Sequence, residues 1–334
     1  MTSQERFRRI MQFKKADRLP LVEWAVWWDK TIERWHAEGL PESITDRYEL
    51  YRYFGLEQYL QDWVPCIGPE APSPVAHGAG VLPGEDYEAD YDAWRHTLFQ
   101  LDEDGPVDPS MWTRWAKQQK AGEAVLWFTL DGFFWLPREL FGIEDHLYSF
   151  FDYPDLMHRM NQDLAEWMIR VIDRICEFAQ PDFMTFAEDM SYNHGPMLSE
   201  PMFDEFMLPY YQQVIPHLKK NGILPFIDSD GDVARAAPWF ARAGIEGILP
   251  LERQAGVDLS AIRSAAPGMR FIGHFDKMTM SRGEAAMRAE FERLLPLARE
   301  GGFIISCDHQ TPPEVSLENY QLYLRLFREY AGQL

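Results

Sequence analysis

Carboxylates follow nearly every predicted strand in the second half of the sequence. They are Asp131, Glu188, Asp189, Asp228, Asp230, Glu252, Asp276 and Asp308, the last directly before His309. Loop starts favour Asp as a helix N-cap, which accounts for Asp131 or Asp228 singly but poorly for the whole set. Clustered carboxylates repel one another unless a cation joins them or some stay protonated. The set therefore predicts a bound divalent metal, a cationic substrate or a protonated carboxylic acid.

The pattern Asp228-Ser-Asp230-Gly places two carboxylates on one side of an extended segment, and Gly231 allows a tight turn after them. Together with His309 they make an O,O,N ligand set. That set suits Zn²⁺ foremost, and Mn²⁺ or Fe²⁺ as well, better than Mg²⁺. A loop turn with a capping Asp and a structural His gives the same pattern, and spacing alone does not decide between the two.

Other acids, bases and one cation at the predicted strand ends are candidates for catalysis: Glu188, Asp189, His194, Glu252, Asp276 and Lys277. Glu188 is a candidate further ligand or general acid. His194 lies in a polar loop and is a candidate general acid or base. The alternative is a solvated side chain without a catalytic role. Lys277 is placed to hold a substrate carboxylate or to pair with Asp276, whereas we expect His274 to be a strand-end residue with a satisfied hydrogen bond.

Aromatic residues make up 14% of the chain, with 12 tryptophans, an excess that suggests a ring-lined pocket. Trp24, Trp27, Trp28 and Glu23 follow the first predicted strand and are candidates for the wall of this pocket. Of these, Trp27, Trp28 and Glu23, with Asp131, are the predicted substrate-binding residues. The alternative for the tryptophans is the start of an amphipathic helix packed on the core.

Short apolar runs alternate with helical stretches from about residue 124 onward. The predicted strands are 125–129, 183–186, 223–227, 247–249, 271–272 and 303–305, preceded by a first strand at 18–22. Helices are expected over 156–178 and 282–299, among others. This alternation predicts a parallel sheet covered on both faces, an α/β fold of the (β/α)8 TIM-barrel type, whose site lies at the carboxyl ends of the strands.

We expect one domain spanning residues 1–334. Residues 1–17 contain a short helix opened by a Thr2–Glu5 capping box, and residues 66–120 are a Pro-, Gly- and acid-rich irregular excursion before the third or fourth strand. No G-x-G-x-x-G or G-x-x-x-x-G-K-[ST] motif is present in the sequence, so it gives no support for nucleotide binding.

The composition narrows the classes of binding partner that the protein is expected to have. The chain has 334 residues and a formal net charge of −21, which disfavours nucleic acid and anionic membranes. No long apolar stretch or signal-peptide pattern is present in the sequence, and three unpaired cysteines suit a cytoplasmic protein. Cys307 is expected to be buried and inert.

Ordered motifs along the chain resemble the uroporphyrinogen decarboxylase superfamily. They are 5–7, 17–20, 188–189, 195–201, 227–232, 244–252, 273–277, 301–304, 308–309, Pro313 and Asn319. The superfamily includes the decarboxylases and zinc methyltransferases that serve corrinoid proteins, and the resemblance implies a TIM barrel, often dimeric. True decarboxylases carry an arginine-rich stretch where this chain reads Trp24-Ala-Val-Trp-Trp-Asp-Lys30, so tetrapyrrole binding is not expected.

The layout resembles the methyltransferases more closely. Their His-x-Cys-Gly motif and later Cys correspond here to Asp228-Ser-Asp230-Gly and His309, which implies a harder metal or none. The leading hypothesis is a metal-assisted methyltransferase or demethylase for a small O- or N-methylated substrate, with a corrinoid protein or folate as acceptor. A metal-independent decarboxylase or lyase on a small non-tetrapyrrole substrate is second, and a non-catalytic binder of a cationic small molecule is third.

Overall fold

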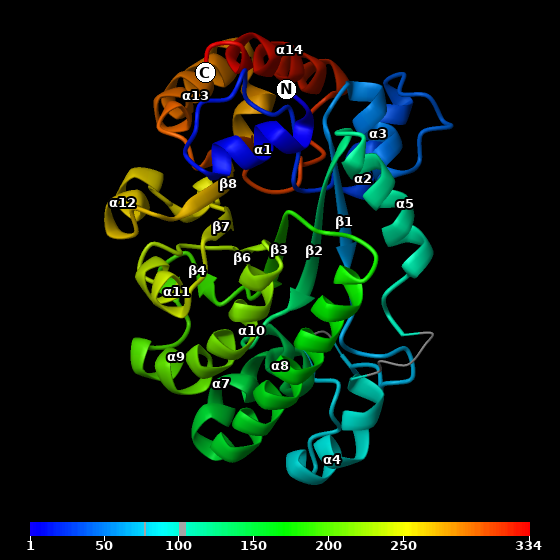
Figure 1. The fold of residues 1–334 in the computed structure, drawn as a ribbon, viewed down its shortest axis with the longest axis vertical. Helices are drawn as coiled ribbons and strands as arrows, with labels where there is room; N and C mark the ends of the chain where they lie inside the picture. The colour runs from blue at the N-terminus through cyan, green and yellow to red at the C-terminus, as the bar shows by residue number, and fades with distance from the viewer. Residues whose placement is uncertain (77, 100–104) are drawn as a thin grey trace.

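Seven parallel strands form one curled sheet in the computed structural model, which describes residues 1–76, 78–99 and 105–334 (Figure 1). Their order is β1 (Gln58–Trp63), β2 (Ala124–Asp131), β3 (Phe183–Ala187), β6 (Leu224–Ser229), β7 (Gly247–Pro250), β8 (Arg270–Phe275) and β9 (Phe303–Cys307). The six strands predicted after residue 124 are confirmed. The result is an α/β fold of the TIM-barrel type.

The first predicted strand, at 18–22, is wrong as a regular strand. The segment is extended and lies between β1 and β9, where the Leu21 carbonyl accepts a hydrogen bond from Glu57 N at 2.8 Å. On its other side, Trp24 N donates to the Ser306 side chain at 3.1 Å instead of to a strand backbone. Pro20 has no N–H to give to a ladder. The segment therefore fills the gap between β1 and β9 and completes the eight-membered wall of the barrel. It does so without the backbone pairing of a strand.

Helices surround the sheet (Figure 1). They are α1 (Ser3–Met11), α2 (Asp29–Ala37), α3 (Arg47–Phe54), α4 (Tyr87–Leu98), α5 (Pro109–Lys120), α6 (Trp135–Phe141), α7 (Ile143–Asp152), α8 (Pro154–Cys176), α9 (Glu200–Phe206), α10 (Leu208–Lys220), α11 (Ala237–Ala243), α12 (Leu259–Ala265), α13 (Glu284–Arg299) and α14 (Leu317–Ala331), with 3₁₀ turns η1 (Arg253–Ala255) and η2 (Lys277–Arg282). A small hairpin, β4 (Ser191–Tyr192) and β5 (Gly195–Pro196), follows β3. No helix within the described ranges has the length and apolar character needed to cross a bilayer.

The N-terminal helix α1 fills the bottom of the barrel. The predicted capping box is present, since Thr2 Oγ1 accepts from Glu5 N at 3.2 Å and Glu5 Oε2 accepts from Thr2 N at 3.0 Å. The Phe7 ring reaches into the barrel and stacks on Phe183 at 5.3 Å between ring centroids. Along β2, alternate residues face this inner core and the outer core beneath the helices.

The excursion at 66–120 lies between β1 and β2, before the third position of the barrel if the 18–22 segment is counted as the first. It is more regular than predicted, because it contains α4 and α5; residues 77 and 100–104 lie outside the described part. Asp108 caps α5 by accepting from Ser110 N at 2.8 Å, and Pro109 follows at the first helical position. The acid- and proline-rich sequence of residues 66–120 therefore contains residues that begin helices.

Candidate functional site

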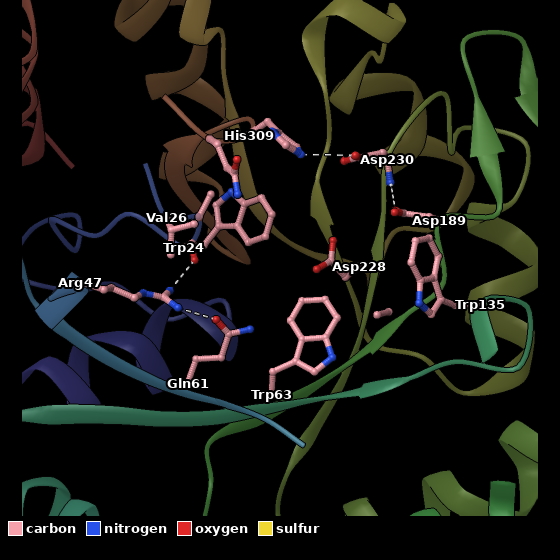
Figure 2. Close-up of a pocket in the computed structure, with 13 residues that line it drawn as sticks. Trp24, Val26, Arg47, Gln61, Trp63, Trp135, Asp189, Asp228, Asp230 and His309 are labelled. Atoms are coloured by element: carbon pink, nitrogen blue, oxygen red, sulfur yellow. Dashed lines mark hydrogen bonds and ion pairs between the residues drawn. The ribbon is translucent and has the colours of Figure 1, made fainter. Parts of the chain in front are cut away.

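A cavity of about 400 Å³ opens at the carboxyl ends of the strands (Figure 2). Its lining residues come from segments far apart in the sequence: Trp24, Ala25, Val26, Arg47, Gln61, Trp63, Trp135, Ala187, Asp189, Asp228, Asp230, His309 and Gln310. Small-molecule sites occupy about 300–1,000 Å³, so this cavity fits a small ligand.

Three carboxylates meet at one side of the cavity because β3 and β6 end next to each other. The Asp228 carbonyl accepts from Glu188 N at 2.9 Å, which joins the two strand ends. Asp189 Oδ1 then accepts from Asp230 N at 3.0 Å. The Asp228 carboxyl group itself receives no hydrogen bond from any residue that the structure describes, and it points into the cavity (Figure 2).

The neighbouring charges set the protonation of these acids. Burial, and then the charges of Asp189 and Asp230, raise the pKa of Asp228 well above its usual value. Burial and the Asp230 charge also raise the pKa of Asp189, to about 6. Burial and the neighbouring charges therefore favour the protonated form of Asp228 over its carboxylate.

The tight turn that follows β6 keeps this arrangement in place. Gly231 has φ +79°, as the sequence predicted for a tight turn, and a Cβ there would lie 2.7 Å from the Ser191 carbonyl. The loop after β6 therefore packs directly on the backbone of the β4–β5 hairpin.

His309 pairs with Asp230 across the cavity mouth, with 3.4 Å between Nε2 and Oδ2. This hydrogen bond raises the pKa of His309. Among the described residues, no group of three or more His, Cys, Asp or Glu side chains is placed to hold a metal ion. The predicted ligands Asp228, Asp230 and His309 share one cavity but do not form a ready-made ligand set, and the metal site stays a prediction.

Tryptophans wall the cavity, and Trp24 is among them, one of the three tryptophans expected there after the first predicted strand. Trp24 is held by a 2.7 Å hydrogen bond from its Nε1 to the Cys307 carbonyl, and its ring stands edge-on to His309. Trp63, at the end of β1, donates to Asp131 Oδ1 at 3.3 Å. Trp135 begins α6 on the side of Asp189 (Figure 2). The sequence excess of tryptophan therefore does contribute to a ring-lined pocket.

The predicted substrate-binding residues Glu23, Trp27 and Trp28 lie outside the lining. Trp27 is buried among aromatic rings of the outer core, including Trp35 and Tyr320. Trp28 is the N-cap residue of α2 and is exposed. The Glu23 carboxylate turns inward and accepts hydrogen bonds from Ser306 Oγ and Cys307 N, both at 2.9 Å. Trp27 and Trp28 thus lie at the start of a helix beside the core, the alternative that the sequence left open, and Glu23 lies against the end of β9.

Glu188, the predicted ligand or general acid, also lies outside the lining. Its carboxylate is fully buried against the start of α6, where it accepts from the backbone N–H groups of Phe133 at 2.8 Å, Phe134 at 2.7 Å and Trp135 at 3.3 Å. The Tyr211 hydroxyl donates to it as well. Glu188 therefore positions the segment that carries Trp135.

The acids and lysine after β7 and β8 form a separate ion-pair cluster. Lys277 Nζ lies 3.1 Å from Glu252 Oε1 and 3.7 Å from Asp308 Oδ1. Asp276 caps η2 by accepting from Met278 N at 2.9 Å. None of these four lines the cavity. The charge of Lys277 is thus compensated within the protein.

Four further predictions concern the rim and the ends of β8 and β9. His194 is exposed on the β4–β5 hairpin, edge-on to Tyr192, and Asp131 reaches the cavity only through Trp63. His274 is buried and its Nδ1 hydrogen bonds to the Leu251 carbonyl at 2.8 Å, as expected. Cys307 is buried, and burial raises the pKa of its thiol well above the usual value, as expected of an inert cysteine.

Arg47, Gln61, Trp63 and Trp135 line the cavity without having been singled out in the sequence. Arg47 begins α3, and Gln61 lies two residues before the end of β1. A signal existed for Trp63 and Gln61, since both stand at the carboxyl end of a barrel strand. None existed for Arg47, whose helix is brought to the cavity by tertiary packing.

Comparisons with known proteins agree with this architecture. A family model described as uroporphyrinogen decarboxylase (URO-D) matches residues 114–330. A uroporphyrinogen decarboxylase from Maricaulis maris (strain MCS10) is 27% identical over 134 residues, 40% of this chain. That match spans only 38% of the relative's length. A solved methyltransferase from Methanosarcina mazei has a TM-score of 0.68 at 16% identity, covering 99% of each chain, which supports the fold.

Proposed function

The chain belongs to the uroporphyrinogen decarboxylase (URO-D) family, and on this premise we propose that it is an enzyme that demethylates a small O- or N-methylated substrate. The observation that carries the proposal is the Asp228 carboxyl group, which is unpartnered among the described residues, faces the cavity and has a pKa raised by burial and by the charges of Asp189 and Asp230. A protonated acid in a small aromatic cavity is suited to give a proton to a leaving oxygen or nitrogen.

In the proposed reaction, Asp228 donates its proton to the substrate heteroatom while the methyl carbon passes to a nucleophilic acceptor. The bond between the heteroatom and the methyl carbon breaks, a bond between that carbon and the acceptor forms, and Asp228 is left as a carboxylate. The proposed acceptor is a corrinoid on a partner protein, or a folate. Trp24, Trp63 and Trp135 shield the reacting centre from water.

The proton donor at this side of the cavity favours an ether over a quaternary methylammonium group. Burial and the charges of Asp189 and Asp230 raise the pKa of Asp228, which favours its protonated form. An ether oxygen requires such a donor because it leaves as an alkoxide or phenoxide, whereas a quaternary ammonium leaves as a neutral amine.

A second candidate is a metal-independent decarboxylase or lyase acting on a small non-tetrapyrrole substrate. The same protonated Asp228 favours it, because such an acid can protonate a carbanion-like carbon. Lys277, expected to hold the substrate carboxylate in that reaction, is instead paired with Glu252 and Asp308. Release of CO₂ without loss of a methyl group would identify this reaction, and binding without any turnover would leave the non-catalytic binder.

The proposal is tested by offering the protein methoxylated and N-methylated small molecules together with free cob(I)alamin as a methyl acceptor. Formation of methylcobalamin is followed by its absorbance, and the demethylated product by mass spectrometry. We expect methoxylated compounds to react and their unmethylated parents to give no signal. Absence of both demethylation and acceptor methylation across the series contradicts the proposal.

The metal-assisted form of the reaction has its own test. Since the three predicted ligands do not converge, we expect purification without chelator to yield protein with well under one Zn²⁺, Mn²⁺ or Fe²⁺ per chain by elemental analysis. Near-stoichiometric metal that is lost in both Asp230→Ala and His309→Ala variants would restore the metal site and overturn the metal-free form.

The pH dependence follows from the state of Asp228. The active form is protonated, so kcat is expected to fall as the pH rises through the raised pKa of Asp228. The charge of Asp189 contributes to that raised value, so Asp189→Asn lowers the pKa of Asp228 and moves the alkaline limb to lower pH by about 1 unit. Asn still accepts the hydrogen bond from Asp230 N. A limb that stays in place or moves upward contradicts the assignment.

A further inference from the structure

The cavity contains a second charged group, opposite the acids. Arg47 lines it, and no carboxylate of the described residues forms an ion pair with this guanidinium. We propose that Arg47 binds an anionic carboxylate on the substrate, so that the substrate is a small methylated carboxylate held by its charged end and demethylated at its other end. The position of the reacting end rests on the proposed function; the anion site does not.

The groups that hydrogen bond to Arg47 are uncharged, and Asp46, whose charge acts on Arg47 through space, caps the N-terminus of α3. The guanidinium Nη1 donates to Gln61 Oε1 at 2.6 Å, and its Nη2 donates to the Trp24 carbonyl at 2.8 Å and to the Tyr51 hydroxyl at 3.3 Å. These three acceptors leave two of the five guanidinium N–H groups without a partner. One of them, on Nε, is buried and has no hydrogen-bond partner among the residues described.

The orientation of Gln61 is fixed from behind. Its amide Nε2 donates to Thr129 Oγ1 at 2.8 Å, and Thr129 Oγ1 is in turn 2.7 Å from Thr185 Oγ1. The amide therefore presents its oxygen, not its nitrogen, to Arg47. This chain of hydrogen bonds holds the guanidinium in the wall of the cavity rather than letting it extend into solvent.

A partly buried arginine without a counter-charge is costly, because burying an unpaired charge loses its hydration. An incoming carboxylate would supply both the missing charge and acceptors for the free N–H groups. The overall charge of −21 makes the absence of an acidic partner for Arg47 more telling, since acidic residues are plentiful in this chain.

The two ends of the cavity face each other across the tryptophans. Figure 2 shows Arg47 and Gln61 on one side, Asp189 and Asp230 on the other, and the Trp24 and Trp63 rings between them. A ligand that spans the cavity thus meets a cation, then flat apolar walls, then a proton donor. A methoxylated aromatic acid and an N-methylated betaine both carry a carboxylate with a methylated heteroatom away from it.

Arg47, Gln61 and Trp63 all precede the segment 114–330 that the family model matches, whereas Asp189, Asp228 and His309 lie within it. The cation end of the cavity is therefore built from the part of the chain outside the family match. Substrate choice is expected to reside in this end.

The test is a binding experiment that requires no turnover. Calorimetry compares matched ligand pairs that differ in the carboxylate: 4-methoxybenzoate with 4-methoxybenzamide, and glycine betaine with choline. We expect at least one carboxylate to bind about tenfold or more tightly than its partner without the carboxylate. The pair that shows the preference identifies the methylated heteroatom.

Three substitutions then separate the charge of Arg47 from its structural contacts. Gln61→Glu places a carboxylate 2.6 Å from Arg47 in the same shape, which neutralises the cation without removing it. This variant is expected to lose the preference for carboxylates and to keep its affinity for the neutral 4-methoxybenzamide. Arg47→Lys is expected to retain part of the preference, and Arg47→Gln none. A merely structural Arg47 would give no loss in Gln61→Glu.

Equal affinities within both pairs, or failure of all carboxylates to bind, overturn the inference. So does a carboxylate preference that survives Gln61→Glu. The Asp228→Asn variant keeps the two proposals apart, because it should retain the preference while losing turnover. A carboxylate preference without any methyl transfer supports the anion site and contradicts the proposed reaction. Methyl transfer without a carboxylate preference supports the proposed reaction and contradicts the anion site.

Discussion

The Asp228→Asn variant is expected to demethylate its substrate about 10²–10⁴-fold more slowly than the wild type, the usual contribution of a general acid. Asparagine has the same shape but no acidic proton, so the leaving heteroatom must depart without one. The side chain receives no hydrogen bond from the described residues, so its replacement disturbs no contact, and substrate affinity should change little. Single-turnover kinetics with cob(I)alamin as acceptor measures the step directly.

Asp232→Asn is the matched control for this variant. Asp232 follows β6 in the same loop, but its carboxylate caps the local backbone by accepting from Ala234 N at 3.0 Å and does not line the cavity. Its rate is expected to stay near that of the wild type. A rate in Asp228→Asn that matches Asp232→Asn would remove Asp228 from the mechanism, and with it the observation on which the proposed function depends.

The second large effect concerns stability. Glu188→Gln is expected to lower the free energy of unfolding by about 2–4 kcal/mol, because each carboxylate oxygen now accepts from two donors. Oε1 accepts from Phe133 N and Tyr211 Oη, and Oε2 accepts from Phe134 N and Trp135 N. Glutamine has one oxygen, so its amide nitrogen must face two donors in either orientation.

Urea denaturation followed by circular dichroism measures this loss. Glu205→Gln on α9, where the side chain is exposed, is the control and should leave the unfolding midpoint unchanged. Gly132 also indicates that Glu188 has a structural role, because a Cβ at this position would lie 2.1 Å from the Glu188 carboxyl carbon. Full stability of Glu188→Gln together with lost turnover would return Glu188 to the catalytic role that the sequence suggested.

The local sequence predicted much of the fold because the barrel strands are short apolar runs bounded by acids. Those runs identified six strands and the rim on which Asp189, Asp228, Asp230 and His309 meet. Sequence patterns could not show which of two adjacent residues faces the cavity. Asp189 enters it, whereas its neighbour Glu188 turns into the protein.

The remaining features depend on contacts between distant segments. Arg47 reaches the cavity because α3 packs beside β1, and Lys277 is neutralised by Glu252, 25 positions earlier. Trp24 and Trp27 are tryptophans of the same segment, so composition does not distinguish them. The structure turns Trp24 toward His309, whereas Trp27 packs in the outer core. Charge compensation and side-chain direction are tertiary properties, so no local pattern could reveal that Arg47 is unpaired and Lys277 is paired.

The segment beside Pro20 has a consequence for how the chain folds during synthesis. Its contacts are with the far end of the sequence: Trp24 N reaches Ser306, 282 positions later, and Leu19 N donates to the Ala331 carbonyl at 3.1 Å. These long-range contacts cannot form until the ribosome has released residues 306 and 331, so the ring closes late. Such high contact order slows folding. Until then the tryptophans of the open barrel are exposed, which makes the nascent chain a natural client for chaperones.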